Sequence, residues 1–274
     1  MGKVILVLCD GLRYDTAVAG MGFLGHLVEA KLASLYKVTG ELPSMSRPMY
    51  ETVHTGLTAS EHGIVSNLVV RRSTKPNIFQ SAREAGKITA AAAYFWFSEL
   101  YNHAPYDRIE DREVDDESLL IQHGRFYTEN DYPDIELFAT AGRLVRRFNP
   151  DYLLVHPMGM DYAGETHGAD SLEYRKHAIR QDMWLAAYLA EWMSREYCIL
   201  VTADHGINGN SEPVVPIKAD FTASGREFNK GLRQARGAVN ATRRESVPAT
   251  AARRRGVRRT HTSNCKAIKV KPIV

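Results

Sequence analysis

Four short, nearly continuous apolar runs lie in the first 210 residues, and longer segments with helical spacing separate them. Runs of this kind are typical of strands buried on both faces, as in a parallel sheet covered by helices. The alternation of strand and helix predicts right-handed crossovers and an α/β fold with a doubly wound, mostly parallel sheet and helices on both faces. The predicted strands are residues 3–9, 87–95, 151–156 and 197–203, and the predicted helices are residues 77–85, 134–148 and 171–194.

Composition places the chain among ordinary soluble globular proteins. Hydrophobic residues make up 44% and charged residues 24% of its 274 residues, which excludes collagen-like, mucin-like and wholly disordered classes. No apolar window is long enough to span a bilayer, and the first apolar run lacks the features of a secretory signal. We therefore expect a cytoplasmic location and no membrane partner. Three cysteines are too few for a disulfide framework or a thiolate zinc site.

The net charge of +3 conceals a basic C-terminal segment. Residues 211–274 contain fifteen Lys or Arg against four Asp or Glu, a net charge of +11, which leaves −8 for residues 1–210. This contrast predicts a catalytic-type domain in residues 1–210 and a basic, irregular tail in residues 211–274. Two interpretations of the tail stay open. It binds nucleic acid through phosphates, or it is a non-native terminus produced by a frame change or a gene truncation.

Acidic residues follow three of the predicted strands. Asp10 follows the first strand, Asp161 comes shortly after the third, and Asp204 with His205 follows the fourth. One such Asp often only caps the next helix or turn. Because ligands of doubly wound sheets bind beyond the carboxyl ends of the strands, several carboxylates at this edge point to a cation. Nitrogen and oxygen ligands suit zinc, with manganese as the alternative.

Glu165 and His167 are candidates for a second metal site. If a helical turn continues from Asp161, Glu165 at i+4 returns to the same face. His167 would need a break in the helix after Gly164. Either residue completes the site under these two geometries, and a structural role remains the alternative for each.

Ser46 is the candidate nucleophile. Pro48 suits the first turn of a helix over residues 49–55, which places Ser46 at or next to the N-cap, where free amides and the helix dipole stabilise an anion. The alternative is that Ser46 is only a cap. The chain has no G-x-S-x-G elbow, no P-loop and no H-E-x-x-H motif, so triad hydrolases and P-loop kinases lose their best support.

Four motifs in order carry a family resemblance. VLCDGLRYD, SRPMYETVHTGLTASEHGIVSN, MDYAGETHG and VTADHG look like the alkaline phosphatase superfamily, and most like its nucleotide pyrophosphatase/phosphodiesterase branch, over residues 3–208. The resemblance implies the fold of this superfamily and two bound divalent metal ions. It also implies a role for each residue that matches the family's motifs by position. Asp10, Asp204 and His205 resemble the ligands of one metal, Ser46 the metal-bound nucleophile, Asp161 the first ligand of the second metal, and Asn67 the residue that bonds a phosphate oxygen.

The chain departs from the family pattern at two places. The family usually writes D-x-x-G-H, whereas here the fifth position is Glu165 and a histidine follows two residues later. The resemblance also calls for a further metal-binding histidine, and after His205 only His261 remains, in an unrelated context. The ligands that complete the second metal site are therefore unassigned. The sheet is expected to be incomplete at its C-terminal side.

The resemblance and the residues together predict metal-dependent hydrolysis of a phosphodiester or pyrophosphate through a phosphoseryl intermediate. The expected substrate is a small phosphate ester or a nucleotide. The aromatic rings of residues 94–97 lie where a leaving group or base can stack, but we expect at least half of these rings to pack in the core. Two alternatives remain. The chain is a truncated relative that keeps the fold and partial metal binding without turnover, or it binds nucleic acid through its tail.

Overall fold

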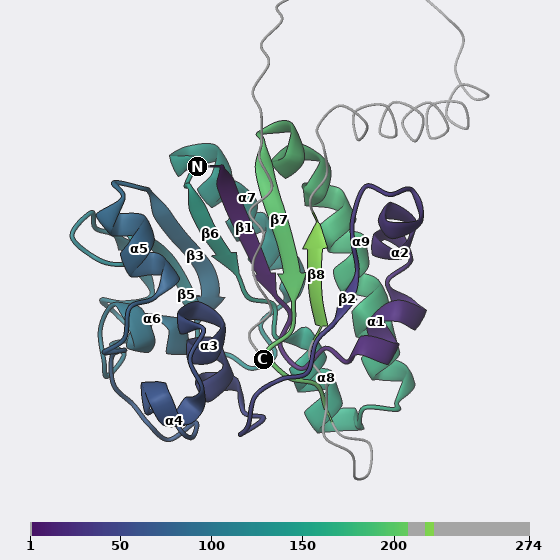
Figure 1. Ribbon diagram of the computed structural model, residues 1–274, viewed down its shortest axis with the longest axis horizontal. Coiled ribbons are helices and arrows are strands. Elements are labelled where there is room, and N and C mark those ends of the chain that lie inside the picture. Colours follow the sequence, from purple (N-terminus) through teal and green to yellow (C-terminus); the bar gives the residue numbers. More distant parts are fainter. Residues whose placement is uncertain (1, 208–216, 222–274) are drawn as a thin grey trace, which may run out of the picture.

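Eight strands form one sheet in residues 2–207 and 217–221, the part of the chain that a computed structural model describes (Figure 1). The strand order is β2-β8-β7-β1-β6-β3-β5-β4. Neighbours from β7 through β5 are parallel, and the pairs β4–β5, β7–β8 and β2–β8 at the two edges are antiparallel. The strands are β1 (Lys3–Leu8), β2 (Tyr36–Lys37), β3 (Thr89–Tyr94), β4 (Glu113–Asp115), β5 (His123–Tyr127), β6 (Tyr152–Val155), β7 (Tyr197–Thr202) and β8 (Ile217–Phe221).

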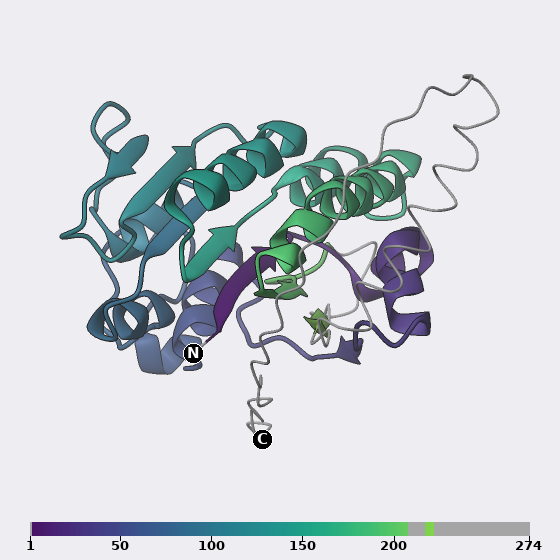
Figure 2. The same ribbon diagram turned by 90° about the horizontal axis from the view of Figure 1, so that it is seen from above.

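Helices cover both faces of the sheet, as Figure 2 shows from above. Alternate residues of the central strands point to opposite faces, so each face has its own core. Val7 of β1 packs with residues of α7 and α9, whereas Leu6 packs with residues of α3, α5 and α6. The helices are α1 (Tyr14–Gly20), α2 (Gly22–Glu29), α3 (Ser46–Thr55), α4 (Ala59–His62), α5 (Ile78–Glu84), α6 (Trp96–Tyr101), α7 (Asp134–Phe148), α8 (Gly159–His167) and α9 (Leu172–Ser194).

The predicted fold class is confirmed, and the predicted elements lie within two residues of β1, β3, β6, β7, α5, α7 and α9. Two helix starts follow the expected capping chemistry. The Asn77 side chain accepts the Gln80 N–H before α5, and the Ser171 side chain accepts the Tyr174 N–H before α9. Helix α3 begins at Ser46, three residues earlier than its predicted start at Met49.

Several elements carry no clear signal in the sequence. Strand β5 (HGRFY) alternates partly buried and buried positions and includes Gly124, so it lacks a continuous apolar run. Strand β8 lies inside the segment that the sequence predicts to be irregular. It pairs with β7 through backbone hydrogen bonds, which leave little trace in hydropathy. Apart from β8, the basic tail, including His261, lies outside the described residues, so its predicted nucleic-acid binding does too.

Gly20, Gly22 and Gly25 have the G-x-G-x-x-G spacing of dinucleotide-binding turns. They lie at the junction of α1 and α2, whereas a dinucleotide-binding turn joins a strand to a helix. Their position therefore gives no support for a dinucleotide site. Among the described helices, none combines the length and the hydropathy needed to cross a membrane.

Candidate active site

The central strand β1 lies between β6 and β7, which brings three strand ends together (Figure 1). Val7 is opposite Val155 of β6, and Leu8 is opposite Thr202 of β7. Beyond the strands, the Cys9 N–H donates to Thr202 O at 2.8 Å and the Asp10 N–H donates to Pro157 O at 3.0 Å. The chain therefore leaves the sheet at neighbouring points, and residues far apart in sequence meet there.

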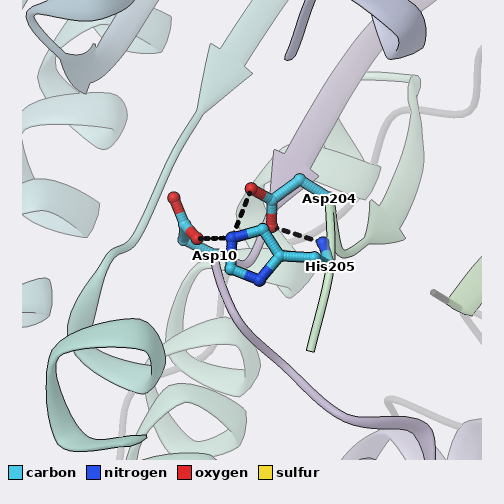
Figure 3. Close-up of side chains that lie close together, drawn as sticks. All are labelled: Asp10, Asp204 and His205. Atoms are coloured by element: carbon cyan, nitrogen blue, oxygen red, sulfur yellow. Dashed lines mark hydrogen bonds and ion pairs between the residues drawn. The ribbon is translucent and has the colours of Figure 1, made fainter. Parts of the chain in front are cut away.

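Asp10, Asp204 and His205 form a buried cluster at this edge (Figure 3). One ligand atom of each lies within 4.8 Å of the others. The His205 ring lies between the two carboxylates, with Nε2 3.4 Å from Asp10 Oδ1 and 3.5 Å from Asp204 Oδ2. Both of these oxygens are buried and accept no hydrogen bond from the residues that the structure describes. Unsatisfied buried carboxylate oxygens facing one imidazole nitrogen fit a divalent cation such as zinc.

Backbone contacts hold the other atoms of this cluster. Asp204 Oδ1 accepts the Gly11 N–H at 3.2 Å and the His205 N–H at 2.8 Å. His205 Nδ1 lies 3.1 Å from Gly206 O, and donation of its N–H to that carbonyl leaves Nε2 as the nitrogen that faces the carboxylates. The cluster is therefore oriented before any ligand binds.

Ser46 lies beside the same histidine. Its Oγ is 2.9 Å from His205 Nε2, and the residue is 7% exposed. Met45 is the N-cap of α3, and Ser46 occupies the first helical position. This agrees with the predicted position of Ser46 at or next to the N-cap. The Arg47 N–H of the same first turn donates to Asn67 Oδ1 at 3.0 Å, which holds the half-buried Asn67 beside the start of α3.

Helix α8 packs directly on the turn after β1. Gly11 has a φ of +67°, and a Cβ there would lie 2.8 Å from Cα of Asp161. Only glycine allows this close approach, which places the 5% exposed Asp161 beside the cluster. The helix continues without a break to His167. Glu165 and His167 are both exposed, and neither joins the group of described residues that surrounds one cation position.

Because α8 is unbroken, it distinguishes Glu165 from His167 as candidate ligands of a second metal. Glu165 at i+4 shares a face with Asp161, whose pKa its charge raises. His167 is six residues beyond Asp161 on this helix and therefore lies on a different face. The structure therefore places Glu165 better than His167, while their roles as metal ligands stay predictions.

Crowding of charge shifts the titration of the whole cluster. Burial, followed by the charge of Asp10, raises the pKa of Asp204 to about 7 and that of Asp161 to about 9. Burial opposes the charged form of His205, but the Asp204 and Asp10 carboxylates outweigh it and raise its pKa to about 9. Burial likewise acts to raise the pKa of Asp10, yet the hydrogen bond with His156 and the charge of His205 lower it overall. Without a cation, the His205 charge and added protons offset the carboxylates.

Two residues that the motifs did not single out contact Asp10. His156 Nε2 lies 3.1 Å from Asp10 Oδ2, and the Tyr50 hydroxyl donates to the same oxygen. His156 directly follows β6, so the rule that selected residues at strand ends could have found it. Tyr50 lies one helical turn beyond Ser46 on α3, and only the fold brings it to Asp10.

The aromatic stretch after β3 divides between two roles. Tyr94 and Phe97 are buried in the two cores, and Phe97 stacks on Tyr50 with ring centroids 4.4 Å apart. Phe95 and Trp96 are only partly buried. The Arg47 guanidinium carbon lies 4.5 Å from the Trp96 ring centroid, and the guanidinium pairs with Glu99 at 2.7 Å. Half of the stretch thus packs in the core, as expected, and Trp96 already has a cation partner.

Comparison with known proteins agrees with the predicted resemblance. Residues 4–264 match the family model described as type I phosphodiesterase / nucleotide pyrophosphatase. The human catalytic subunit of GPI ethanolamine phosphate transferase 3 is 22% identical over 236 residues, and that of transferase 2 is 22% identical over 219 residues. These alignments include 77% and 75% of this chain. The chain spans about a fifth of the length of these relatives, 20% and 21% respectively.

Solved structures share the fold at low sequence identity. Murine ectonucleotide pyrophosphatase/phosphodiesterase 5 in complex with AMP gives a TM-score of 0.58 at 18% identity, covering 75% of this chain and 57% of the murine chain. Phosphonoacetate hydrolase from Sinorhizobium meliloti 1021, in complex with phosphonoformate, gives 0.54 at 20% identity, with 75% and 56% covered. The alkaline phosphatase-like architecture is therefore shared.

Proposed function

Because the chain belongs to the type I phosphodiesterase / nucleotide pyrophosphatase family, we propose that it hydrolyses phosphodiester or pyrophosphate bonds in small phosphate esters or nucleotides. The family supports hydrolysis of a phosphate ester as the class of reaction. The finer proposal is that Ser46 is the nucleophile and that Asp10, Asp204 and His205 hold a divalent cation.

One observation carries this proposal. Ser46 Oγ lies 2.9 Å from His205 Nε2, inside a cluster whose two facing carboxylate oxygens accept no hydrogen bond within the described part of the chain. A serine that served only as a helix cap would bond to backbone amides of its own helix. Met45 is the N-cap instead, and α3 has no side-chain cap hydrogen bond. The Ser46 hydroxyl is thus directed at the cluster and is available for chemistry.

The residues divide the reaction between them. Ser46 Oγ attacks phosphorus, and the bond to the leaving oxygen breaks as the phosphoseryl bond forms. The Ser46 proton passes to solvent, which returns a proton to the leaving oxygen. Attack by water on that intermediate then releases phosphate or a phosphate monoester and restores the hydroxyl. A zinc or manganese ion at Asp10, Asp204 and His205 would lower the pKa of the Ser46 hydroxyl and neutralise the carboxylates.

Asn67 and the start of α3 are suited to hold the phosphoryl oxygens. Asn67 Oδ1 is fixed by the Arg47 N–H, so the orientation of its side-chain amide is set by the nucleophile helix. The N-terminus of α3 adds its dipole. Donors fixed in this way stabilise charge that develops on the equatorial oxygens in the transition state.

We place a second cation only at Asp161. Its carboxyl is buried beside Asp10, and its raised pKa is the response expected of an acid that lacks a counter-charge. Glu165 would be its partner on the same helix face. A cation there would stabilise the leaving oxygen.

The test is release of nitrophenol from bis-nitrophenyl phosphate by the chelator-treated protein after zinc or manganese is added. We expect turnover that depends on metal and disappears in Ser46→Ala. The matched control is Ser44→Ala, because Ser44 is exposed and only two residues away. Denaturation during turnover, followed by mass analysis, should show a phosphoryl group on Ser46.

Two outcomes would count against hydrolysis. Metal binding without Ser46-dependent release would favour the relative that keeps the fold and has lost turnover. Nucleic-acid binding that weakens steeply with salt, and is lost on deletion of residues 211–274, would favour a function of the basic tail.

Transfer to an alcohol is a second candidate function, because the curated relatives are named ethanolamine phosphate transferases. The phosphoseryl intermediate would then pass its phosphoryl group to an alcohol oxygen instead of to water. Addition of an alcohol acceptor separates the two functions. With a transferase, the fraction of phosphoryl groups passed to the acceptor exceeds the mole fraction of the acceptor in the solvent. With a hydrolase, it does not.

A further inference from the structure

His156 is a buried histidine for which the proposed chemistry has no role. It is 0% exposed and lies at the carboxyl end of β6, where its N–H donates to Ala92 O at 3.0 Å and continues the sheet. Its Nε2 lies 3.1 Å from Asp10 Oδ2. A buried polar ring at this depth is retained only with its hydrogen bonds made.

The two oxygens of Asp10 have different surroundings. His156 and the Tyr50 hydroxyl both bond to Oδ2. Oδ1 faces His205 Nε2 and, among residues 2–207 and 217–221, finds no hydrogen-bond donor. The protein thus satisfies one oxygen and leaves the other for a cation, which fixes the rotation of the carboxylate.

The His156 ring is held on its other sides as well. Tyr127 OH lies 3.1 Å from His156 Nδ1 and donates to His156 O at 2.7 Å. The edge of the ring meets Tyr50 with centroids 4.9 Å apart, and Phe97 lies at 5.0 Å. Because these partners come from α3, α6 and β5, the ring cannot turn without moving three elements.

We propose that His156 is a positioning residue, which orients Asp10 so that Oδ1 is presented to the cation. This inference rests on the proposed function, since it takes a cation to bind at Asp10. Partners of this kind around metal ligands typically change metal affinity by about 10- to 100-fold when they are removed. His156 acts through Asp10 and contacts neither substrate nor cation.

The experiment measures zinc binding to the full chain after chelator treatment, by competition with a chromophoric chelator and without substrate. In His156→Gln the side-chain amide can reach the position of Nε2. In His156→Asn the shorter amide can replace only Nδ1. We expect His156→Asn to weaken zinc binding by about 10-fold or more, and His156→Gln to recover most of the loss.

His54 supplies the matched control. Its ring is also buried and also packs on Phe97, with centroids 5.6 Å apart. Its Nε2 contacts the Tyr152 hydroxyl at 3.2 Å, and its Nδ1 lies 2.8 Å from the backbone carbonyl of Tyr50 and not from the hydroxyl that bonds Asp10. His54→Asn should lower thermal stability about as much as His156→Asn and leave zinc affinity unchanged. Equal loss of affinity in both variants would mean that His156 acts only through stability.

Tyr127→Phe adds an independent measurement, because it removes only the hydroxyl that fixes the His156 ring. It should weaken zinc binding by less than His156→Asn does. If His156→Asn does not fold, Tyr127→Phe alone tests whether His156 positions Asp10. Wild-type zinc affinity in Tyr127→Phe and in any folded His156→Asn protein would overturn the inference. If wild type binds zinc no more tightly than Asp204→Asn does, the proposed metal site itself fails, which separates the two conclusions.

Discussion

The two groups of candidate metal ligands at the carboxyl edge of the sheet are assembled in different ways. Asp10, Asp204 and His205 follow neighbouring parallel strands, so the strand register alone brings them together. Asp161 and Glu165 share one helix, where each residue advances about 100° around the axis. Strand ends concentrate ligands from distant parts of the chain, whereas a helix directs only some of its side chains to one site.

Loss of a strand-end ligand should have the largest effect. Asp204→Asn keeps the acceptor for the Gly11 and His205 amides but removes the charge that a cation needs. We expect turnover of bis-nitrophenyl phosphate to fall by at least about 10³-fold, which corresponds to about 4 kcal/mol of transition-state stabilisation. In chelator, the same variant should melt at or above the wild-type temperature, because a buried carboxylate beside Asp10 is gone.

The control for this variant is Asp170→Asn, since Asp170 is an exposed partner of Arg13 beyond the end of α8. Its turnover should equal that of wild type. A lower melting temperature of metal-free Asp204→Asn would show that the strand-end carboxylates do not repel one another in the folded chain.

A substitution of Asn67 tests whether substrate binding can be impaired without a change in metal affinity. Asn67→Asp keeps an acceptor for the Arg47 N–H but loses the amide donor. Loss of one donor of this type costs about 10²- to 10³-fold in kcat, so a fall of about 10²-fold is expected with zinc affinity unchanged. Ser66→Ala is the neighbouring control. A parallel loss of zinc affinity would place Asn67 in the metal site instead.

The strand-end group could be predicted from the sequence, because continuous apolar runs fix where the chain leaves the sheet. The two further residues that bond Asp10 carry a weaker signal. His156 ends such a run, but a histidine within an apolar stretch is as typical of a core as of a site. Tyr50 is two residues beyond Pro48 in a predicted helix, and nothing local shows that its hydroxyl reaches Asp10.

The edges of the sheet show the same limit. Strand β5, next to the edge strand β4, has Arg125 and His123 paired with Asp115 of β4, so side-chain ion pairs and backbone bonds near the edge take the place of a continuous apolar run. Hydropathy predicts burial, and it fails where the strand is held by its neighbours instead. The central elements were therefore predictable to within two residues, whereas the edge strands were not.

The pH dependence of stability should change with metal. The folded pKa values of Asp204 and Asp161, about 7 and about 9, lie above their ordinary 3.8, so their stabilising contribution is present below about pH 4. It is lost as pH rises through about 7 and about 9. His205, raised to about 9 from 6.5, acts in the same direction, whereas the lowered pKa of Asp10 matters only below about pH 4.

Urea denaturation of the chelator-treated protein should therefore show falling stability between about pH 5 and about pH 9. A cation at about a hundred times its Kd should add about 2.7 kcal/mol. The gain should grow with pH, because protons and metal compete for the same carboxylates. Metal-free stability that rises over this range would contradict the raised pKa values of the cluster.

The smallest effects should separate the two exposed residues of α8. Glu165→Gln removes the charge that shares a helix face with Asp161, so at saturating metal we expect turnover to fall by about 10-fold and the second equivalent of manganese to bind more weakly. His167→Gln should change neither quantity, because His167 is six residues beyond Asp161 on an unbroken helix and therefore lies on a different face of it. Both side chains are exposed, so neither change should alter stability by more than about 0.5 kcal/mol. A larger loss in His167→Gln than in Glu165→Gln would mean that α8 opens after Gly164 when metal binds, as the alternative geometry of this motif requires. Helix content measured with and without manganese would then have to fall as well.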